Sequence, residues 1–188
     1  MAEYYLISQL PSLDGLSEST PLPITEERFL ELCHRFLDKK AQSELDKLSL
    51  IPSREGEKSS SPLINSWCDG ERTLRLVLAK IRAEKMKKTF DVQASENSSF
   101  SPILTQTVRS AVETDNPMEA ENLLNVYRLA FLETLRPTDA FSVEYVFYYY
   151  LKLKLILRMK EFDFDSGVTA YKNIYNSIMN GDNLEAVQ

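Results

Sequence analysis

The chain has 188 residues, of which 43% are hydrophobic and 27% charged, a composition typical of a globular protein with a buried core. Its net charge of −6 and isoelectric point near 5.0 argue against non-specific binding of nucleic acid, which needs a basic surface. The length suits one domain spanning residues 1–188.

Two features bear on the cellular compartment. Of the two cysteines, Cys33 lies on an apolar helix face, so we expect a buried thiol there and no disulfide with Cys68. The N-terminus lacks the charged region, apolar core and cleavage site of a signal peptide. We therefore expect an intracellular, soluble, cytoplasmic protein that meets a membrane only through a partner.

The first third of the chain predicts an extended arm followed by two short helices. Residues 4–13 are aromatic and in part β-branched, which favours a strand or an extended segment. Thr25 is a predicted N-cap, and the helix that follows is expected to end near Leu37. A second helix is expected over 41–50, and the composition of 52–62 predicts a loop.

The middle of the chain predicts three more helices. Residues 65–88 have helical spacing, with a potential break at Asp69-Gly70. Ser101-Pro102 and Asn116-Pro117 each combine a capping residue with proline at the first helical position. The second of these helices is expected to run to about Arg136, before Pro137.

The segment 142–160 is the predicted centre of the fold. Ser142 is its predicted cap, and apolar side chains cover almost its whole circumference, so other helices must surround it. Charges interrupt the run, which excludes a membrane span. A last helix, capped by Asp165 or Ser166 and stopped by Gly181, carries a further apolar stripe. The sequence therefore predicts an all-α fold of about seven helices in an irregular bundle around 142–160.

A search for catalytic, cofactor or metal residues yields no candidate that we would assign. His34 is the single histidine and adjoins Cys33, so the two side chains do not face each other on a helix. Neither GxGxxG nor GxxxxGK[ST] occurs, so no glycine-rich phosphate loop is predicted. Glu161, Asp163 and Asp165 could form a cation site, but a solvated turn with a helix cap explains them better.

The strongest surface feature is a basic stretch within 71–88. One interpretation is a solvated face paired with neighbouring acids; the other is a docking patch for an acidic protein. Arg75 and Arg82 are seven residues apart and share one side of the helix. Tyr148 and Lys152 belong to the mixed half of the central helix. The candidate partner-binding residues are Arg72, Arg75, Arg82, Lys85, Tyr148 and Lys152.

The order of five segments resembles a known family. These segments are YYLISQLPSL at 4–13, ITEERFLELC at 24–33, ERTLRLVLAKIRAEK at 71–85, DNPMEAENLLNVYRLAFLETL at 115–135 and LKLKLILRMKEFDFDSG at 151–167. Together they resemble an uncharacterised bacterial family encoded beside components of V-type (A/V-type) ATPases. That family is distantly similar to the central-stalk socket component of these ATPases, which is designated C, or d in eukaryotes.

The resemblance implies a structural role without chemistry. The socket component is an all-α, funnel-like protein that sits on the membrane rotor ring and receives the central shaft. The implied partners are therefore other V-type ATPase subunits, in the shaft or the rotor ring, and the implied location is peripheral to the inner membrane. This chain is much shorter than the three-lobed socket component.

Two alternatives belong to other functional classes. One is a small helical enzyme that uses carboxylates near Glu161 and Asp163, which would require a concave pocket around them. The other is a helical adaptor unrelated to ATPases.

Overall fold

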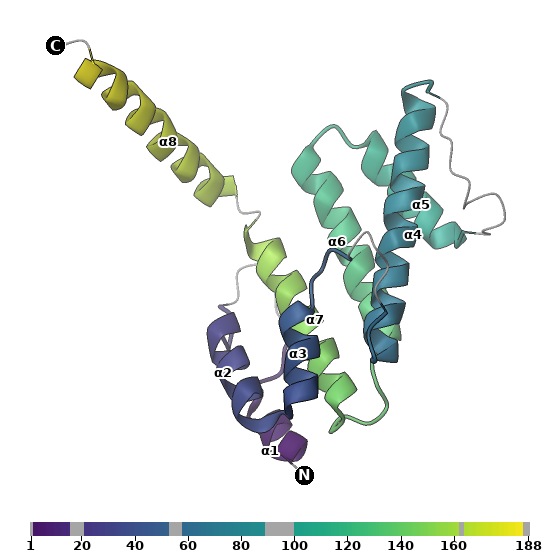
Figure 1. Ribbon diagram of the computed structural model, residues 1–188. Coiled ribbons are helices and arrows are strands. Elements are labelled where there is room, and N and C mark those ends of the chain that lie inside the picture. Colours follow the sequence, from purple (N-terminus) through teal and green to yellow (C-terminus); the bar gives the residue numbers. More distant parts are fainter. Residues whose placement is uncertain (1, 16–20, 53–57, 89–99, 162–163, 186–188) are drawn as a thin grey trace.

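The computed structural model describes residues 2–15, 21–52, 58–88, 100–161 and 164–185, and all regular structure within these ranges is helical (Figure 1). The predicted all-α class is confirmed. The helices are α1 (Ala2–Gln9), α2 (Glu26–Phe36), α3 (Lys39–Lys47), α4 (Pro62–Lys85), α5 (Pro102–Glu113), α6 (Pro117–Thr134), α7 (Val143–Glu161) and α8 (Phe164–Glu185).

The N-terminal arm is helical, so the prediction of an extended segment or strand is wrong. In α1, the carbonyl of Tyr5 accepts hydrogen bonds from the side chains of Ser8 and Gln9, at 3.0 and 3.1 Å. Leu6 is fully buried, and Gly15 closes the following turn with φ of 71°. The aromatic composition favoured a strand, but packing of one helical face against the core decides the conformation.

The predicted start of α2 is confirmed by its cap. The Thr25 hydroxyl accepts from the backbone N–H of Arg28 at 3.2 Å, and two glutamates follow in the first turn. The next helix, α3, begins earlier than expected because Asp38 caps it, accepting from the N–H of Ala41 at 2.7 Å.

Helix α4 passes through Asp69-Gly70 without a break. A Cβ atom at Gly70 would lie 2.2 Å from the Phe131 ring on α6, so glycine serves here for a close helix crossing. Past Met86, Lys87 takes φ of 53°, and the N–H of Lys88 bonds to the carbonyl of Ala83 at 3.0 Å. This left-handed cap ends the helix and satisfies its last carbonyls.

The two proline-started helices begin where the sequence predicts, but only one has the expected cap. The Asn116 side chain accepts from the N–H of Met118 at 3.0 Å and donates to the Glu119 carboxylate at 3.1 Å. Ser101 precedes Pro102 but makes no side-chain cap hydrogen bond.

The helices pack around two hydrophobic clusters. The larger joins α1, α2 and α3, the start of α4 and the end of α6 to α7; it includes Trp67 and a run of buried residues from Val146 to Ile156. The smaller joins the second half of α4 to α5 and the first half of α6. The predicted sheathing of the central helix is confirmed, and Ser142 caps it by accepting from the N–H of Tyr145 at 3.2 Å.

The last helix differs from the rest. Figure 1 shows α8 extending away from the other helices, beyond the end of α7. It continues past Gly181 to Glu185, so the predicted stop at Gly181 is wrong. It also starts at Phe164, inside the segment expected to form a turn and a cap.

Candidate functional site

Lys152, near the middle of α7, bonds to the segment after α1 and to the end of α6. Its amine donates to the carboxylates of Asp14 at 2.5 Å and Glu133 at 2.6 Å. The Tyr148 hydroxyl donates to the same Glu133 oxygen at 2.7 Å. The segment after α1 and the end of α6 are thereby held against α7 by charge-assisted hydrogen bonds.

These contacts move the pKa values of the cluster away from neutrality. Burial opposes charging of Lys152, but its two carboxylate partners hold its pKa above the ordinary lysine value. The Lys152 hydrogen bond lowers the pKa of Asp14. Burial would raise the pKa of Glu133, yet hydrogen bonds from Lys152 and Tyr148 lower it. Burial, followed by the bond to Glu133, raises the pKa of Tyr148 to about 12. The cluster therefore suits a permanent clamp better than proton transfer near pH 7.

Two neighbouring tyrosines fasten the N-terminal segments in the same way. The Tyr149 hydroxyl donates to the carbonyl of Pro11, and the Tyr150 hydroxyl to the Glu26 carboxylate, both at 2.8 Å. Their rings stack on Phe29 of α2, with centroids 5.4 and 5.1 Å away. Each tyrosine ring thus packs in the core, while its hydroxyl group holds an N-terminal segment in place by a hydrogen bond.

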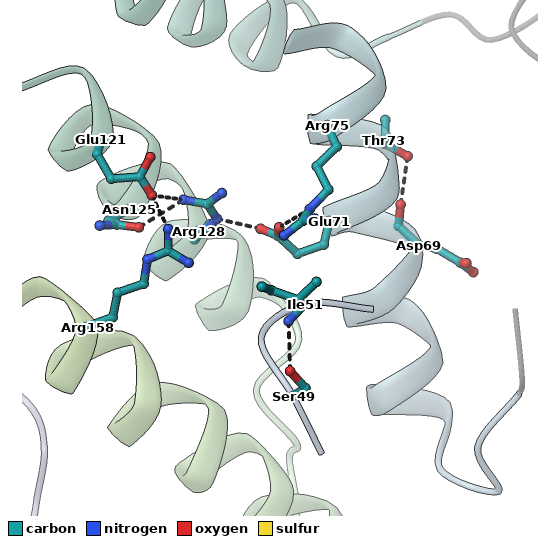
Figure 2. Close-up of polar contacts among 10 residues, drawn as sticks. All are labelled: Ser49, Ile51, Asp69, Glu71, Thr73, Arg75, Glu121, Asn125, Arg128 and Arg158. Carbon is teal, nitrogen blue, oxygen red and sulfur yellow. Dashed lines mark hydrogen bonds and ion pairs between the residues drawn. The ribbon is translucent and has the colours of Figure 1, made fainter. Parts of the chain in front are cut away.

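A second polar cluster links α4, α6 and α7 (Figure 2). Arg128 donates through Nε to Glu71 at 2.6 Å and through one terminal nitrogen to Glu121 at 3.0 Å and Asn125 at 2.9 Å. Arg158 of α7 reaches the same Glu121 oxygen at 2.6 Å. The side chains of Glu71 and Arg128 are only 3% and 8% exposed, so this is a buried ion pair.

The basic residues predicted on α4 lie mainly at the surface. Arg75 is exposed and makes one long contact with Glu71, at 3.4 Å, while Arg72 pairs with Asp69 at 2.8 Å. Arg82 is also exposed. Lys85 instead donates to the carbonyl of Val112 at 2.6 Å and so joins α4 to α5.

Tyr148 and Lys152 are not surface residues. Tyr148 is 2% exposed and Lys152 is 8% exposed, and their polar atoms donate hydrogen bonds to Glu133 and Asp14. The prediction of a partner contact therefore does not suit them. Helical spacing places both residues on the half of α7 that mixes apolar and charged side chains, but α6 and the N-terminal segment cover that half as well.

Two cavities border α7. One of about 260 Å³ is lined by Asp14, Arg136 and Lys152, among others. The second is a shallow surface depression of about 390 Å³, lined by Glu26, Lys154, Arg158 and Glu161 and by the loop after α3. Glu161 thus does line a concave surface, as the enzyme alternative requires. The other carboxylate named for that alternative, Asp163, lies outside the described residues.

The thiol and imidazole groups are placed apart from both cavities. Burial raises the pKa of Cys33 to about 12, as expected for an inert thiol in the core. His34 lies on the surface, with Nε2 3.1 Å from an Asp46 oxygen. Among the described residues, no three side chains of histidine, cysteine, aspartate or glutamate are grouped to hold a metal.

The described part of α8 carries an apolar stripe at the surface. Tyr171, Ile174, Tyr175, Ile178 and Met179 are between 49% and 68% exposed. They recur at three- and four-residue spacing, which places them on one face of the helix. The sequence showed the stripe, but its exposure follows from the position of α8 outside the bundle.

Residues 101–182 match a family described as a protein of unknown function, DUF2764. The match begins at α5 and ends within α8. No curated protein and no solved structure matches the chain. Within the described residues, no helix has both the length and the apolarity needed to cross a bilayer.

The hydrogen bonds and ion pairs of the polar groups at the centre of the molecule mainly hold one segment of the chain against another. Sequence reasoning missed the pair of Glu71 and Arg128, since partners 57 positions apart leave no local pattern. It also missed Glu121, although this residue and Arg128 are seven positions apart on one helix. The available signal was that these charged residues lie in the middle of predicted helices. Charged residues are rarely buried unless they are paired, so any that the fold buries there must have a partner of opposite charge.

Proposed function

We propose that the chain is a non-catalytic structural or coupling subunit associated with a V-type ion-translocating ATPase, in the position of the central-stalk socket. The observation that carries this proposal is the use of the charged and phenolic groups of α7 as internal ties. The name of the assembly comes from the resemblance of the sequence to a family encoded with such ATPases.

A coupling subunit must resist shear, and the ties around α7 suit that demand. Lys152 holds Asp14 and Glu133, Tyr150 holds Glu26, and a second helix face reaches Glu121 through Arg158. These contacts join the N-terminal segment, α2 and α6 to one helix. Because each contact is charge-assisted and partly shielded from water, sliding α7 along its neighbours would break several strong hydrogen bonds together.

The exposed arginines of α4 supply a surface for docking. Arg75 and Arg82 lie on one side of the helix, and both are exposed. Guanidinium groups bind carboxylates bidentately, so an acidic face of a shaft or rotor-ring subunit is the expected partner. Docking of this kind needs no membrane-inserted segment in this chain.

Native purification from the source organism tests the proposal. A tagged copy should recover subunits of the ATPase head, shaft or rotor ring at moderate salt, and recovery of none of them would contradict the association. The pair Arg75→Gln and Arg82→Gln should weaken recovery and reduce its salt dependence. The matched control is Lys39→Gln with Lys40→Gln, which removes the same charge from exposed positions on α3.

If recovery is unchanged in both double variants, the association stands but α4 is not its docking surface. If both variants lose recovery equally, the effect is one of total charge, and the assigned surface is wrong.

A further inference from the structure

We propose that α8 pairs, in antiparallel orientation, with α8 of a second copy of this chain. The inference rests on the exposed stripe of Tyr171, Ile174, Tyr175, Ile178 and Met179. It is independent of any ATPase, since a dimer could form whether or not the chain joins a larger assembly.

The stripe is exposed to solvent in the part of the chain that the structure describes. Every described side chain from Tyr171 to Met179 is exposed, and Figure 1 shows the helix leading away from the bundle. Most helices in proteins are stabilised by packing of an apolar face, and a lone helix is marginal in water. A contiguous apolar surface of this kind marks an interaction site.

The charge pattern favours a second copy over an acidic or basic partner. Between Gly167 and Met179 the sequence contains a single charged residue, Lys172, in a protein of net charge −6. The face therefore has no charge that would select an oppositely charged surface. When two copies of the segment 167–179 face each other, the two Lys172 side chains are the only like charges that this segment brings together.

The stripe is also self-complementary when one helix is reversed. A two-fold axis level with the midpoint of Ile174 and Tyr175 places Tyr171 level with Ile178 of the other copy, and Ile174 level with Tyr175. At both of these levels one tyrosine faces one isoleucine, while Met179 is level with Ala170 of the other copy. Tyr171 and Tyr175 already stack within one helix, with centroids 6.2 Å apart, and present a continuous surface for the two isoleucines.

Antiparallel pairing also separates the bundles that α1 to α7 form in the two copies. Each bundle adjoins the first residue of α8, and α8 has 22 residues, which corresponds to a length of about 33 Å. In a protein of net charge −6, antiparallel helices put the two bundles at opposite ends of the helix pair, whereas parallel helices put them side by side. Lys172 of one copy is then level with Ser177 of the other, so the two Lys172 backbone positions are about 7.5 Å apart along the axis.

The expected affinity is modest. From Tyr171 to Met179 the stripe extends only about 13 Å. A helix face of that length cannot supply the roughly 800 Å² per partner of a standard interface. We therefore expect a dimer that dissociates reversibly on dilution.

Sedimentation equilibrium of the full chain over a wide concentration range tests the pairing. The expected result is a monomer–dimer equilibrium that Ile174→Glu with Ile178→Glu weakens at least about tenfold. The matched control is Asn173→Glu with Asn176→Glu, which adds the same charge to the opposite face of α8. Circular dichroism of both variants verifies that the helices remain folded.

Three outcomes would overturn the proposal. The chain could be monomeric at every concentration, both double variants could dimerise like the wild type, or both could weaken the dimer equally. A monomer whose α8 binds a different protein would count as the first outcome, because the stripe would then have another occupant.

Orientation is tested by cross-linking in a Cys68→Ser background. Chains with Tyr171→Cys are mixed with differently tagged chains carrying Ile178→Cys. Antiparallel pairing favours the mixed disulfide, whereas parallel pairing favours disulfides between identical chains. A predominance of identical pairs would reject the antiparallel arrangement.

Discussion

The buried pair of Glu71 and Arg128 makes the sharpest prediction about stability. Replacing Arg128 by methionine keeps an unbranched stem but removes the guanidinium group and its hydrogen bonds of 2.6, 3.0 and 2.9 Å to Glu71, Glu121 and Asn125. Glu71 would remain as a carboxylate with 3% exposure and only a 3.4 Å contact to Arg75.

The magnitude follows from that residual contact. Removing one partner of a buried ion pair costs about 3–5 kcal/mol, because the other charge is left uncompensated. The remaining interaction of Glu71 with Arg75 offsets part of this, so we expect a loss of about 3 kcal/mol. For a chain of this size the melting temperature should fall by about 6–12 °C.

Urea unfolding followed by fluorescence measures the loss. Trp67 is the single tryptophan and is fully buried in the larger cluster, so its emission reports on the core. The control is Arg75→Met, which removes a 44% exposed partner of the same carboxylate and should cost less than about 1 kcal/mol. The double variant Glu71→Leu with Arg128→Met should recover much of the loss, because neither member of the buried pair is left as an uncompensated charge.

Two results would refute this reasoning. Arg128→Met could cost no more than Arg75→Met, which would mean that water reaches Glu71 in the folded protein. Alternatively, the costs of Glu71→Leu and Arg128→Met could simply add, which would mean that the two groups are not energetically coupled.

Lys152→Met should lower the free energy of unfolding at pH 7 by about 1–2 kcal/mol, a value discounted for the exposure of its carboxylate partners. Because the pKa of Asp14 is lowered in the folded protein, the difference between wild type and variant should be complete above about pH 5. Urea unfolding at a series of lower pH values should show that difference shrinking. Gly70→Ala should destabilise by about 1 kcal/mol, because overlap with Phe131 outweighs a gain in helix propensity of about 1 kcal/mol; thermal melts should show no such loss for Gly167→Ala, because that position has open space around it. Cys33 should react with a thiol reagent only on unfolding, since burial raises its pKa to about 12; rapid labelling in the native state would contradict its burial.

Local patterns were sufficient to predict most helix starts. Thr25, Asn116 and Ser142 cap their helices as expected, because a capping side chain bonds to an N–H only two or three residues away. The all-round apolar composition of 142–160 was sufficient to predict a central, covered helix. In both cases the physical cause lies within one helix, so the linear order of residues contains it.

Tertiary structure decided the features whose causes lie far apart in the chain. The helical state of residues 2–9 and the role of Gly70 depend on which surfaces these segments meet. Lys152 and Asp14 are 138 positions apart, so a spacing rule cannot pair them. The sequence by itself therefore determined most of the helices and that 142–160 must be covered. Only the path of the chain decided which charges are buried together and that the apolar face of α8 is left at the surface, since packing and desolvation act between segments that no local pattern connects.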